Sequence, residues 1–444
     1  MNRKFVILVS AVAALGGLLF GFDTAIISGA IPFITPYFRL DEYLLGWAVS
    51  CILVGCAAGA LGAGPLADRW GRKKVLLICA FLFALSGLGA GLSHHLVPFI
   101  LFRLAGGLGV GAAAMVSPMY ISEMAPASWR GRLVAFYQLA IVLGILTAYF
   151  SNYLFSDMGA EGWRWMFASQ AFPSLLFALL LLAVPETPRW LIRQGRHAEA
   201  RTVLQKTSGD FYAEREMRDI EQSFSNHPLG ASSSTASVFQ KAYRPVLLVG
   251  ILLAVIQQVT GINSILYYAP VIFQQTGLSG SSSMLQTISI GVINVVSTFI
   301  AIGLVDRLGR KKFLLIGSFL MGLSLVTIAI CFHFQYFDHY FVLISMLLYV
   351  GAFGCTLGAV TWVYLSEIFP NRVRGMALSV ATLALWLADF IVTYTFPMMN
   401  KHLGIAQTLL CYATLCILAF FYMYRNIRET KGRSLEEIEL LFTK

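Results

Sequence analysis

An aspartate lies inside the first long apolar run of the chain. Asp23 is the only charged side chain in residues 5–34. An ionised carboxylate near the centre of a membrane helix costs about 2.5–3.5 kcal/mol on insertion scales, so it becomes a functional hypothesis wherever a partner can be named. Arg103 is the only basic residue inside another apolar run, and the glycines at 106, 107, 109 and 111 would allow close helix packing there. We expect Asp23 and Arg103 to neutralise each other.

Amide side chains form a second group that could do chemistry. Gln257, Gln258 and Asn263 lie in one apolar run. Amides donate and accept hydrogen bonds without charge, which suits a neutral ligand dense in hydroxyl groups. On one continuous helix, positions 257, 260, 264 and 268 would share a face, with Gln258 and Asn263 beside it. Polar contacts between membrane helices are the alternative, and they explain single residues better than the whole Gln-Gln-x-x-x-x-Asn group.

Two aromatic residues could complete such a site. Phe20 and Trp362 lie in other apolar runs, and either ring could cover the apolar side of a pyranose.

Carboxylates and arginines at the ends of apolar runs form a third group, which occurs twice. The first set is a Gly-x-x-x-Asp-Arg-x-Gly-Arg-Lys run with a downstream Glu and Arg, and the second copy is one residue shorter after its first glycine. These residues are Asp68, Arg72, Glu123 and Arg130, matched by Asp306, Arg310, Glu367 and Arg374. Carboxylate–guanidinium pairs have fixed geometry. We expect them to pair only when the two repeats close at one side of the membrane, as a latch. Loop charge that sets topology alone is the alternative.

The composition is typical of an integral membrane protein. Hydrophobic residues make up 58% of the 444 residues and charged residues 12%, against about 45–50% and about 25% in soluble domains. No run alternates with a period of two, so helices must satisfy the backbone. Twelve apolar runs could cross about 30 Å of hydrocarbon, and we place them at 6–34, 44–67, 75–93, 97–121, 133–154, 165–184, 245–274, 284–305, 313–333, 340–365, 376–398 and 405–424.

The basic residues follow the topology of these spans. Counted from a cytoplasmic N-terminus, all but four of the 32 Lys and Arg residues fall in inner loops or tails, which is the positive-inside pattern. The net charge of +10 therefore sets topology and does not indicate a nucleic-acid partner. We expect both termini in the cytoplasm. The seven cysteines lie in apolar runs without metal-ligand spacing, so we expect no disulfide framework and no metal.

The chain divides into two homologous halves. Besides the charged motifs, Pro185-Glu186-Thr187 recurs as Arg428-Glu429-Thr430. Parallel six-helix repeats are a plan of transporters, with the substrate at the midplane. We place the N-terminal half at 1–184, a cytoplasmic helical linker at 185–244, the C-terminal half at 245–424 and a cytoplasmic tail at 425–444. The linker holds a helix-permissive charged run at 199–221 and a flexible tract at 230–234.

These motifs resemble a known family. The doubled charged loop is similar to the signature of the major facilitator superfamily. Pro-Glu-Thr-Pro-Arg-Trp from Pro185, Gln-Gln-x-x-Gly-Ile-Asn from Gln257 and Glu-Thr-Lys-Gly-Arg-Ser from Glu429 narrow the resemblance to the sugar porters. It covers essentially the whole chain and is closest to bacterial proton-coupled symporters of the xylose and glucose type. One departure is Arg428, where the closing motif of the family usually has proline.

The resemblance implies a function and a site. It implies symport of a proton with a hexose or pentose by alternating access, by a monomer in the lipid bilayer of the cell inner membrane, without a cofactor. It implies that Asp23 and Arg103 couple the proton and that the latch holds the outward-facing state. The implied sugar contacts, with Tyr267 as a gate, are Gln138, Gln257, Gln258, Asn263, Asn294 and Trp362. We add Phe20 and Trp386 as expected substrate-binding residues.

A coupling cycle follows as a hypothesis. The repeat aligns Asp23 with Asn263 and Arg103 with Leu347, so the charged pair belongs to one half. Burial and a nearby guanidinium act in opposite directions on the proton affinity of a carboxylate. Facing out, Asp23 would bind a proton and release Arg103, and sugar binding would then draw the halves together and break the latch. Facing in, sugar would leave and Arg103 would help to expel the proton. A purely structural ion pair is the alternative.

Three residues depart from the pattern of the xylose-type proteins. Leu385 replaces a sugar-binding Gln, and Ile145 replaces a second polar residue, so the choice of sugar stays open. Asp389 stands where Asn is expected, one helical turn from Leu385 on the same face. It could reach the transport pathway or lie in solvent near the membrane interface.

Other functions fit the sequence less well. The seven histidines lie mostly in loops and accompany no nucleophile–His–acid group, so an enzyme is not expected. A sugar sensor would need a long signalling tail. A proton-independent sugar uniporter and a polyol–proton symporter remain the alternatives, and an intact Asp23 argues against the uniporter.

Overall fold

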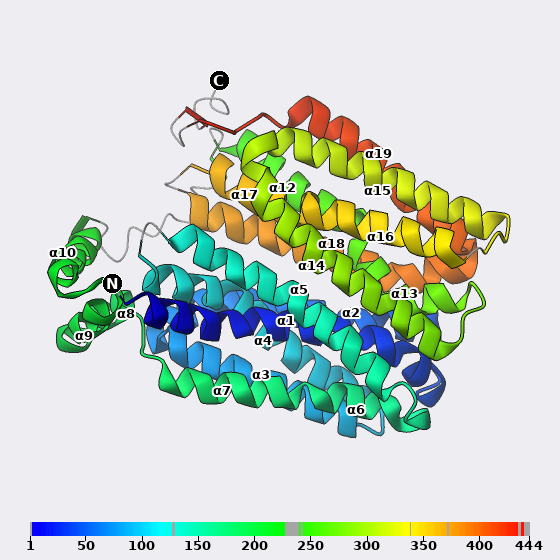
Figure 1. Ribbon diagram of the computed structural model, residues 1–444, viewed down its shortest axis with the longest axis horizontal. Helices are drawn as coiled ribbons and strands as arrows, with labels where there is room; N and C mark the ends of the chain where they lie inside the picture. Colours follow the sequence, from blue (N-terminus) through cyan, green and yellow to red (C-terminus); the bar gives the residue numbers. More distant parts are fainter. Residues whose placement is uncertain are drawn as a thin grey trace. The chain divides into compact units, whose positions relative to one another are not determined.

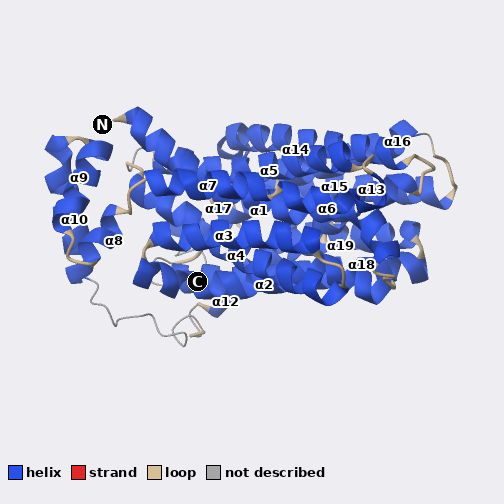
Figure 2. Cartoon of the chain, turned by 90° about the horizontal axis from the view of Figure 1, so that it is seen from below, coloured by secondary structure: helices blue, strands red, loops and turns tan. Residues whose placement is uncertain are grey.

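The computed structural model describes residues 2–126, 129–226, 239–240, 243–337, 339–370, 373–433 and 437–438. These ranges form helices joined by loops, without a strand among them (Figure 1, Figure 2). Twelve helical stretches in the described ranges are long and apolar enough to cross a membrane. The predicted all-helical membrane fold is therefore confirmed, with span ends that differ by a few residues from the predicted ones.

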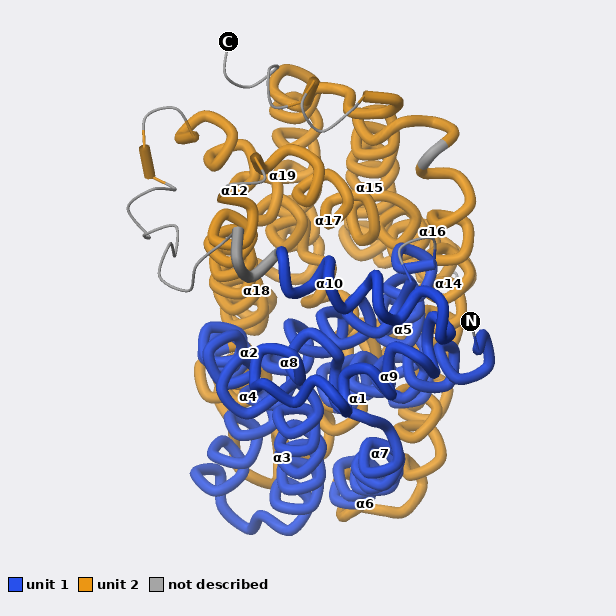
Figure 3. The backbone as a smooth tube through the Cα atoms, turned by 90° about the vertical axis from the view of Figure 1, so that its left-hand side faces the viewer, with its two compact units in different colours: residues 1–26, 54–148, 164–232 blue, residues 27–53, 149–163, 233–444 orange. Residues whose placement is uncertain are grey.

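Residues 1–26, 54–148 and 164–232 form one compact unit (Figure 3). Helix α3 packs against α4 and α7 in this unit. Phe83 of α3, Phe99 of α4 and Phe177 of α7 have no exposed surface and belong to its core. The membrane-spanning helices that contribute wholly or in part are α1 (Arg3–Tyr37), α2 (Glu42–Trp70), α3 (Arg72–Leu92), α4 (Leu96–Met124), α5 (Arg130–Phe155), α6 (Gly162–Ser169) and α7 (Ala171–Ala183).

Three short helices after α7 also belong to this unit, namely α8 (Pro188–Arg193), α9 (His197–Ser208) and α10 (Asp210–Asn226). Helix α9 packs against both α8 and α10. Proline at the first position suits the start of α8, because its missing N–H would have no helical partner. The predicted linker helices are thus present, whereas the tract at 230–234 lies outside the described residues.

Residues 27–53, 149–163 and 233–444 form the other compact unit. Helix α15 packs against α16 and α19, and α12 packs against α18. Besides the end of α1, the start of α2, the end of α5 and η1 (Gly159–Glu161), it holds α12 (Arg244–Val259), α13 (Ile262–Gln274), α14 (Gly280–Leu308), α15 (Arg310–His333), α16 (His339–Cys355), α17 (Leu357–Ile368), α18 (Arg374–Leu403) and α19 (Ile405–Asn426). This unit takes in two segments of the predicted first half, and the predicted domain boundaries stay a prediction.

Two membrane spans of the second unit are broken helices. Helices α12 and α13 are separated at Gly261, whose φ of 90° is left-handed and suits glycine. Helices α16 and α17 are separated at Thr356. The prediction that positions 257–268 share one continuous helical face is therefore wrong. Transporters often place their binding groups at such breaks, where backbone and side chains are freed from the helix.

Candidate functional site

Asp23 and Arg103 form a fully buried ion pair in the first unit. Arg103 Nη1 donates to Asp23 Oδ1 at 2.5 Å and to the backbone oxygen of Asp23 at 2.9 Å. Both side chains have no exposed surface. The close contact between these two residues, which the sequence predicted, is therefore present. Of the two carboxylate oxygens of Asp23, Arg103 contacts only Oδ1.

The remaining polar atoms of this pair are not satisfied by hydrogen bonds. Asp23 Oδ2 and Arg103 Nε and Nη2 have no hydrogen-bond partner among the described residues. The ring of Phe167 lies 5.5 Å from the Arg103 guanidinium carbon, and the fully buried Gln170 side chain lies beside Asp23. A buried carboxylate oxygen without a donor is costly when charged. Because Arg103 donates to Oδ1 and to the backbone oxygen, Oδ2 can accept a proton while these two hydrogen bonds remain.

Glycine makes room for the free carboxylate oxygen. A Cβ at Gly106 of α4 would lie 2.6 Å from Asp23 Oδ2 and would also meet the Ser86 hydroxyl. That space is too small for any side chain. The glycine-rich part of α4 therefore does more than pack helices closely: it shapes the wall around Asp23.

The amide residues of span 7 meet across its break. Asn263 Nδ2 donates to Gln258 Oε1 at 3.0 Å and to Asp389 Oδ2 at 2.7 Å. In a continuous helix, positions five residues apart point about 140° away from each other, so this contact depends on the interruption at Gly261. Gln257 Nε2 donates to the backbone oxygen of Leu357, the first residue of α17, at 2.8 Å. Two broken spans are thus joined at the amide cluster.

Asp389 is the one member of this cluster whose side chain can ionise. It is 1% exposed, so solvation near the membrane interface is excluded as the explanation for this residue. Leu385, one turn earlier on α18, is also buried. The sequence indicated a shared face but gave no sign that Asp389 would contact Asn263.

The other expected sugar contacts are distributed between the two units. Asn294, Tyr267 and Trp386 are buried in the second unit, whereas Trp362 of α17 is 39% exposed. Phe20 of α1 and Gln138 of α5 belong to the first unit and are half-buried. Their roles as sugar contacts stay predictions.

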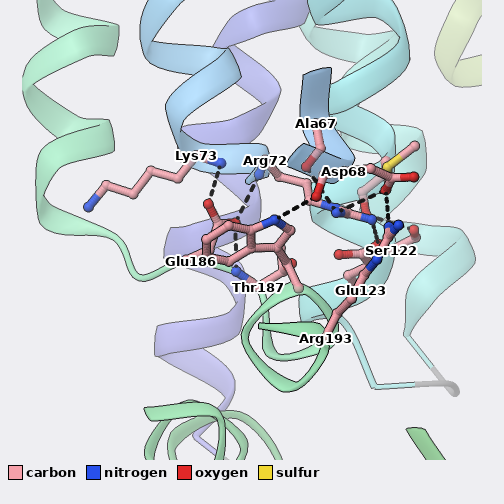
Figure 4. A network of polar contacts seen from close by, with 11 residues as sticks. Ala67, Asp68, Arg72, Lys73, Ser122, Glu123, Glu186, Thr187 and Arg193 are labelled. Atoms are coloured by element: carbon pink, nitrogen blue, oxygen red, sulfur yellow. Dashed lines mark hydrogen bonds and ion pairs between the residues drawn. The ribbon is translucent and has the colours of Figure 1, made fainter. Parts of the chain in front are cut away.

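Charged residues meet at the ends of α2, α3 and α4 in the first unit (Figure 4). Arg72 is close to the Glu123 carboxylate at 3.0 Å and to Asp68 at 3.3 Å, and it donates to the backbone oxygen of Ala67 at 3.1 Å. Arg193 of α8 lies 3.0 Å from Asp68. A cavity of about 370 Å³ adjoins this cluster. Helix α8 is thereby tied to the C-terminal end of α2.

The second unit contains a matching pair. Arg310 Nη2 lies 2.8 Å from Glu367 Oε1, and the Thr430 hydroxyl donates to Glu367 Oε2 at 2.6 Å. Each pair therefore forms inside one unit. Both partners of Arg72–Glu123, and both of Arg310–Glu367, belong to the same packed unit. That these pairs form only when the two repeats close stays a prediction.

The remaining latch residues make other contacts. Arg130 Nε donates to the backbone oxygen of Ser122 at 3.0 Å, and Arg374 Nε donates to that of Phe369 at 3.1 Å. The side chain of Asp306 lies outside the part of the chain that is described. A role of these residues in a latch stays a prediction.

Comparison with known proteins identifies the family. The family described as "Sugar (and other) transporter" matches residues 9–442. The chain belongs to this sugar transporter family. It is 40% identical to the arabinose-proton symporter of Bacillus subtilis, over 100% of this chain and 96% of that protein. It is 37% identical to the glucose facilitated diffusion protein of Zymomonas mobilis, over 99% of this chain and 98% of that protein.

The fold of this sugar transporter also matches solved structures. An inward-open structure of the xylose transporter XylE from E. coli aligns with a TM-score of 0.87 and 38% identity, over 98% of this chain and 100% of that chain. The predicted membership of the major facilitator superfamily is confirmed. The chain is therefore a multi-pass membrane protein of a family of transporters.

Two carboxylates of the transporter were missed as site residues. Glu186 accepts hydrogen bonds from the backbone N–H groups of Arg72 at 3.1 Å, Lys73 at 3.0 Å and Thr187 at 2.8 Å. Glu429 accepts from those of Arg310 at 2.9 Å and Lys311 at 3.1 Å. Both cap the N-terminus of a membrane helix, where negative charge is favourable. The signal was in the sequence, since both belong to the repeated Glu-Thr motif.

Burial changes the chemistry of Glu186. Desolvation raises the pKa of its carboxyl above the usual range, although three backbone N–H groups and Arg72 favour the ionised form. The transporter thus holds a partly buried, proton-sensitive group outside its membrane spans, at a joint between α3 and α8.

Proposed function

We propose that this chain is a proton-coupled monosaccharide symporter of the cell inner membrane, with both termini in the cytoplasm, working as a monomer by alternating access. The observation that carries the proposal is the fully buried Asp23–Arg103 pair, in which Arg103 contacts only one of the two carboxylate oxygens. A facilitator has no need of a titratable group at such a cost. The positive-inside distribution of Lys and Arg supports the orientation.

The pair supplies the proton-binding step. When Oδ2 of Asp23 takes a proton, the carboxylate loses its charge and its hold on Arg103 weakens. When the proton leaves, the ion pair reforms at its 2.5 Å contact. Driving this cycle with a membrane potential provides roughly 2.3 kcal/mol per charge for each 100 mV, equivalent to about a fifty-fold concentration ratio of sugar. The charged clusters around Arg72 and Arg310 are the proposed switch of alternating access.

The sugar class rests on the amide cluster. Gln257, Gln258 and Asn263 offer neutral donors and acceptors at the break of span 7, which suits hydroxyl groups. The relatives differ in sugar: one is named for arabinose and another for glucose. Hexoses and pentoses are therefore both proposed, with polyols as the alternative ligand class.

A facilitated-diffusion relative keeps the uniporter as the second candidate function. The deciding experiment compares Asp23→Asn with wild type in vesicles that carry a proton gradient. We expect uphill accumulation to fall to the level of gradient-free vesicles, because the amide cannot cycle a proton, while sugar counterflow is retained. Asp157→Asn, at an exposed carboxylate, is the matched control and should leave both activities unchanged.

Two outcomes would count against the proposal. Accumulation that survives Asp23→Asn would rule out this residue as the proton site, and gradient-independent transport in wild type would establish the uniporter. A panel of D-xylose, L-arabinose, D-glucose and sorbitol, measured by thermal shift on purified protein, identifies the ligand class independently.

A further inference from the structure

A second carboxylate is buried in the membrane-spanning part of the transporter. Asp389 Oδ2 accepts a hydrogen bond from Asn263 Nδ2 at 2.7 Å, and Oδ1 accepts one from the Thr393 hydroxyl at 3.2 Å. Both donors are neutral, and Asp389 forms no ion pair with any Lys, Arg or His among the described residues. Among the described residues, the carboxylate of Asp389 is therefore stabilised by neutral hydrogen-bond donors and not by an opposite charge. Each of these donors must point its N–H or O–H at the carboxylate.

The helices around Asp389 carry their charges at their ends. Of the helices packed against α18, α13 has no charged residue, α12 begins with Arg244, and α17 and α19 have Glu367 and Arg425 as their second-last residues. Helix α2, whose Trp47 ring meets Phe390, begins with Glu42, which pairs with Lys401. Arg374, Lys401 and His402 lie on α18 itself, at least about 18 Å along the helix from Asp389. The titratable phenols and thiols on these helices and on α18 itself are Tyr43, Cys51, Cys56, Tyr267, Tyr268, Tyr364, Tyr394, Cys411, Tyr412, Cys416, Tyr422 and Tyr424.

An ionised Asp389 dictates how Asn263 is turned. A carboxylate can only accept, so the amide nitrogen of Asn263, and not its oxygen, must face it. The second N–H of the same nitrogen is used by Gln258 Oε1. Both donors of Asn263 are thus occupied, and its carbonyl oxygen is the group left for a ligand. Because Gln258 Oε1 is occupied in turn, Gln258 is left with its NH2 group.

Gln257 is oriented in the same way by the neighbouring broken span. Its Nε2 donates to the backbone oxygens of Leu357 and Gly358, at 2.8 and 3.4 Å. The carbonyl oxygen of Gln257 accepts no hydrogen bond among the described residues. Backbone oxygens cannot change from acceptor to donor, so this orientation does not depend on protonation.

We propose that Asp389 is a positioning residue that fixes the donor–acceptor order of Gln258 and Asn263, so that a bound sugar meets the NH2 of Gln258 beside the carbonyl oxygen of Asn263. The inference rests on the proposed function, because it takes these amides as sugar contacts. When Asp389 is protonated it can donate, and Asn263 and Gln258 can then turn over together. Proton binding at Asp389 thereby changes which sugar hydroxyls are recognised.

The order makes a chemical demand on the ligand. A hydroxyl that faces Asn263 Oδ1 has to donate, whereas one that faces the Gln258 NH2 only has to accept. Replacing a hydroxyl by fluorine removes the donor and keeps a weak acceptor, while replacing it by hydrogen removes both. At the position facing Asn263, the fluoro sugar should therefore bind as poorly as the deoxy sugar. At the position facing Gln258, the fluoro sugar should bind better than the deoxy sugar.

The test measures binding of D-glucose and its monodeoxy and monofluoro derivatives to the purified full chain. In wild type we expect one ring position at which the fluoro and deoxy affinities are equal. In Asp389→Asn the affinities of the fluoro and deoxy sugars at this position should differ by about fivefold, which corresponds to the net contribution of one hydrogen bond. The reason is that an amide can also donate, so it no longer fixes the orientation of Asn263. Ratios that stay the same in wild type and Asp389→Asn at every ring position would overturn the proposal.

A pH series separates positioning from a purely structural role. It is made in the Asp23→Asn background, so that the other buried carboxylate does not titrate. We expect the fluoro-to-deoxy ratio to change with pH when Asp389 is present and to be flat with Asp389→Asn. Thr393→Val, which removes the other donor to Asp389 at nearly constant volume, should shift the pH of that change. An unshifted or absent pH change would overturn the proposal even if Asp389→Asn fails to fold.

Failure of this inference is distinguishable from failure of the proposed function. If wild type binds D-glucose and shows proton-driven accumulation but Asp389→Asn alters no ratio, only the role of Asp389 is refuted. If neither D-glucose nor any sugar of the panel binds, the amide cluster is not a sugar site and both proposals fall.

Discussion

The carboxylate of Glu186 holds the first turn of α3 through the backbone N–H of Arg72, at 3.1 Å and across 114 residues of sequence. The same arrangement joins Glu429 to Arg310 in the second unit, at 2.9 Å. In both places the arginine side chain is thereby presented to a second carboxylate, Glu123 or Glu367. The repeated Glu-Thr motif and the repeated charged loop are therefore two parts of one structural device.

The Glu186 cap predicts a pH-dependent stability. At acidic pH, Glu186→Gln should lower the free energy of unfolding by about 1–2 kcal/mol, because both oxygens of a protonated carboxyl can still accept from the N–H groups of Arg72 and Lys73, whereas the NH2 of an amide cannot accept. Since burial raises the pKa of Glu186, the folded protein binds this proton more tightly than the unfolded chain. Its contribution to stability is present at acidic pH and is lost as pH rises through the raised pKa.

The difference between wild type and Glu186→Gln should therefore shrink as pH rises from acidic to neutral. Thermal unfolding of both proteins in one detergent, over that pH range, measures it. A difference that grows with pH would show that the N–H groups outweigh burial at this carboxylate.

The cap formed by Glu186 requires a residue without a side chain at position 71. The φ of 96° at Gly71 is left-handed, and a Cβ there would collide with the Glu186 carboxylate. Gly71→Ala should lower the free energy of unfolding by about 1–2 kcal/mol from backbone strain alone, and it should also reduce transport by displacing Glu186. Gly64→Ala, seven residues earlier on α2, is the matched control, because nothing lies within 4 Å of the added methyl group. Equal effects of the two substitutions on the unfolding temperature would contradict this account.

Some of this architecture could be predicted from the sequence and some could not. The spans, the repeats and the Asp23–Arg103 contact follow from apolar run length and from the rarity of buried charge. The break at Gly261 could not be predicted, because a glycine in an apolar run is as compatible with close helix packing as with a left-handed turn. Without the break, the contacts of Asn263 with Gln258 and Asp389 stay hidden, since helical periodicity places Asn263 and Gln258 on different faces.

The contacts in the charged clusters at the helix ends also could not be fully predicted from the sequence. Sequence spacing identified which carboxylates and arginines belong together, but pairing within one unit depends on how α3 packs on α4, which spacing does not encode. The cap role of Glu186 needed the backbone direction at Arg72, and side-chain patterns carry no information on that.

Substitution of Gly106 should disturb proton coupling although no charged residue is replaced. The methyl group of Gly106→Ala would lie 2.6 Å from Asp23 Oδ2, so the carboxylate has to move relative to Arg103. We expect overpacking to cost about 1–3 kcal/mol of stability and proton-driven accumulation to fall, while sugar counterflow persists. Gly62→Ala on α2, where the nearest atom lies 4.0 Å from the added methyl, is the control and should accumulate sugar like wild type.

A second substitution, at Ser86, distinguishes the effect of Gly106→Ala on stability from its effect on proton coupling. The same methyl group would also meet the Ser86 hydroxyl, so part of the lost stability comes from that contact. Ser86→Gly added to Gly106→Ala removes that hydroxyl and should restore much of the unfolding temperature, whereas Asp23 remains displaced and accumulation stays low. If accumulation recovers together with stability, the space at Gly106 serves packing against Ser86, and Asp23 Oδ2 does not need it for coupling.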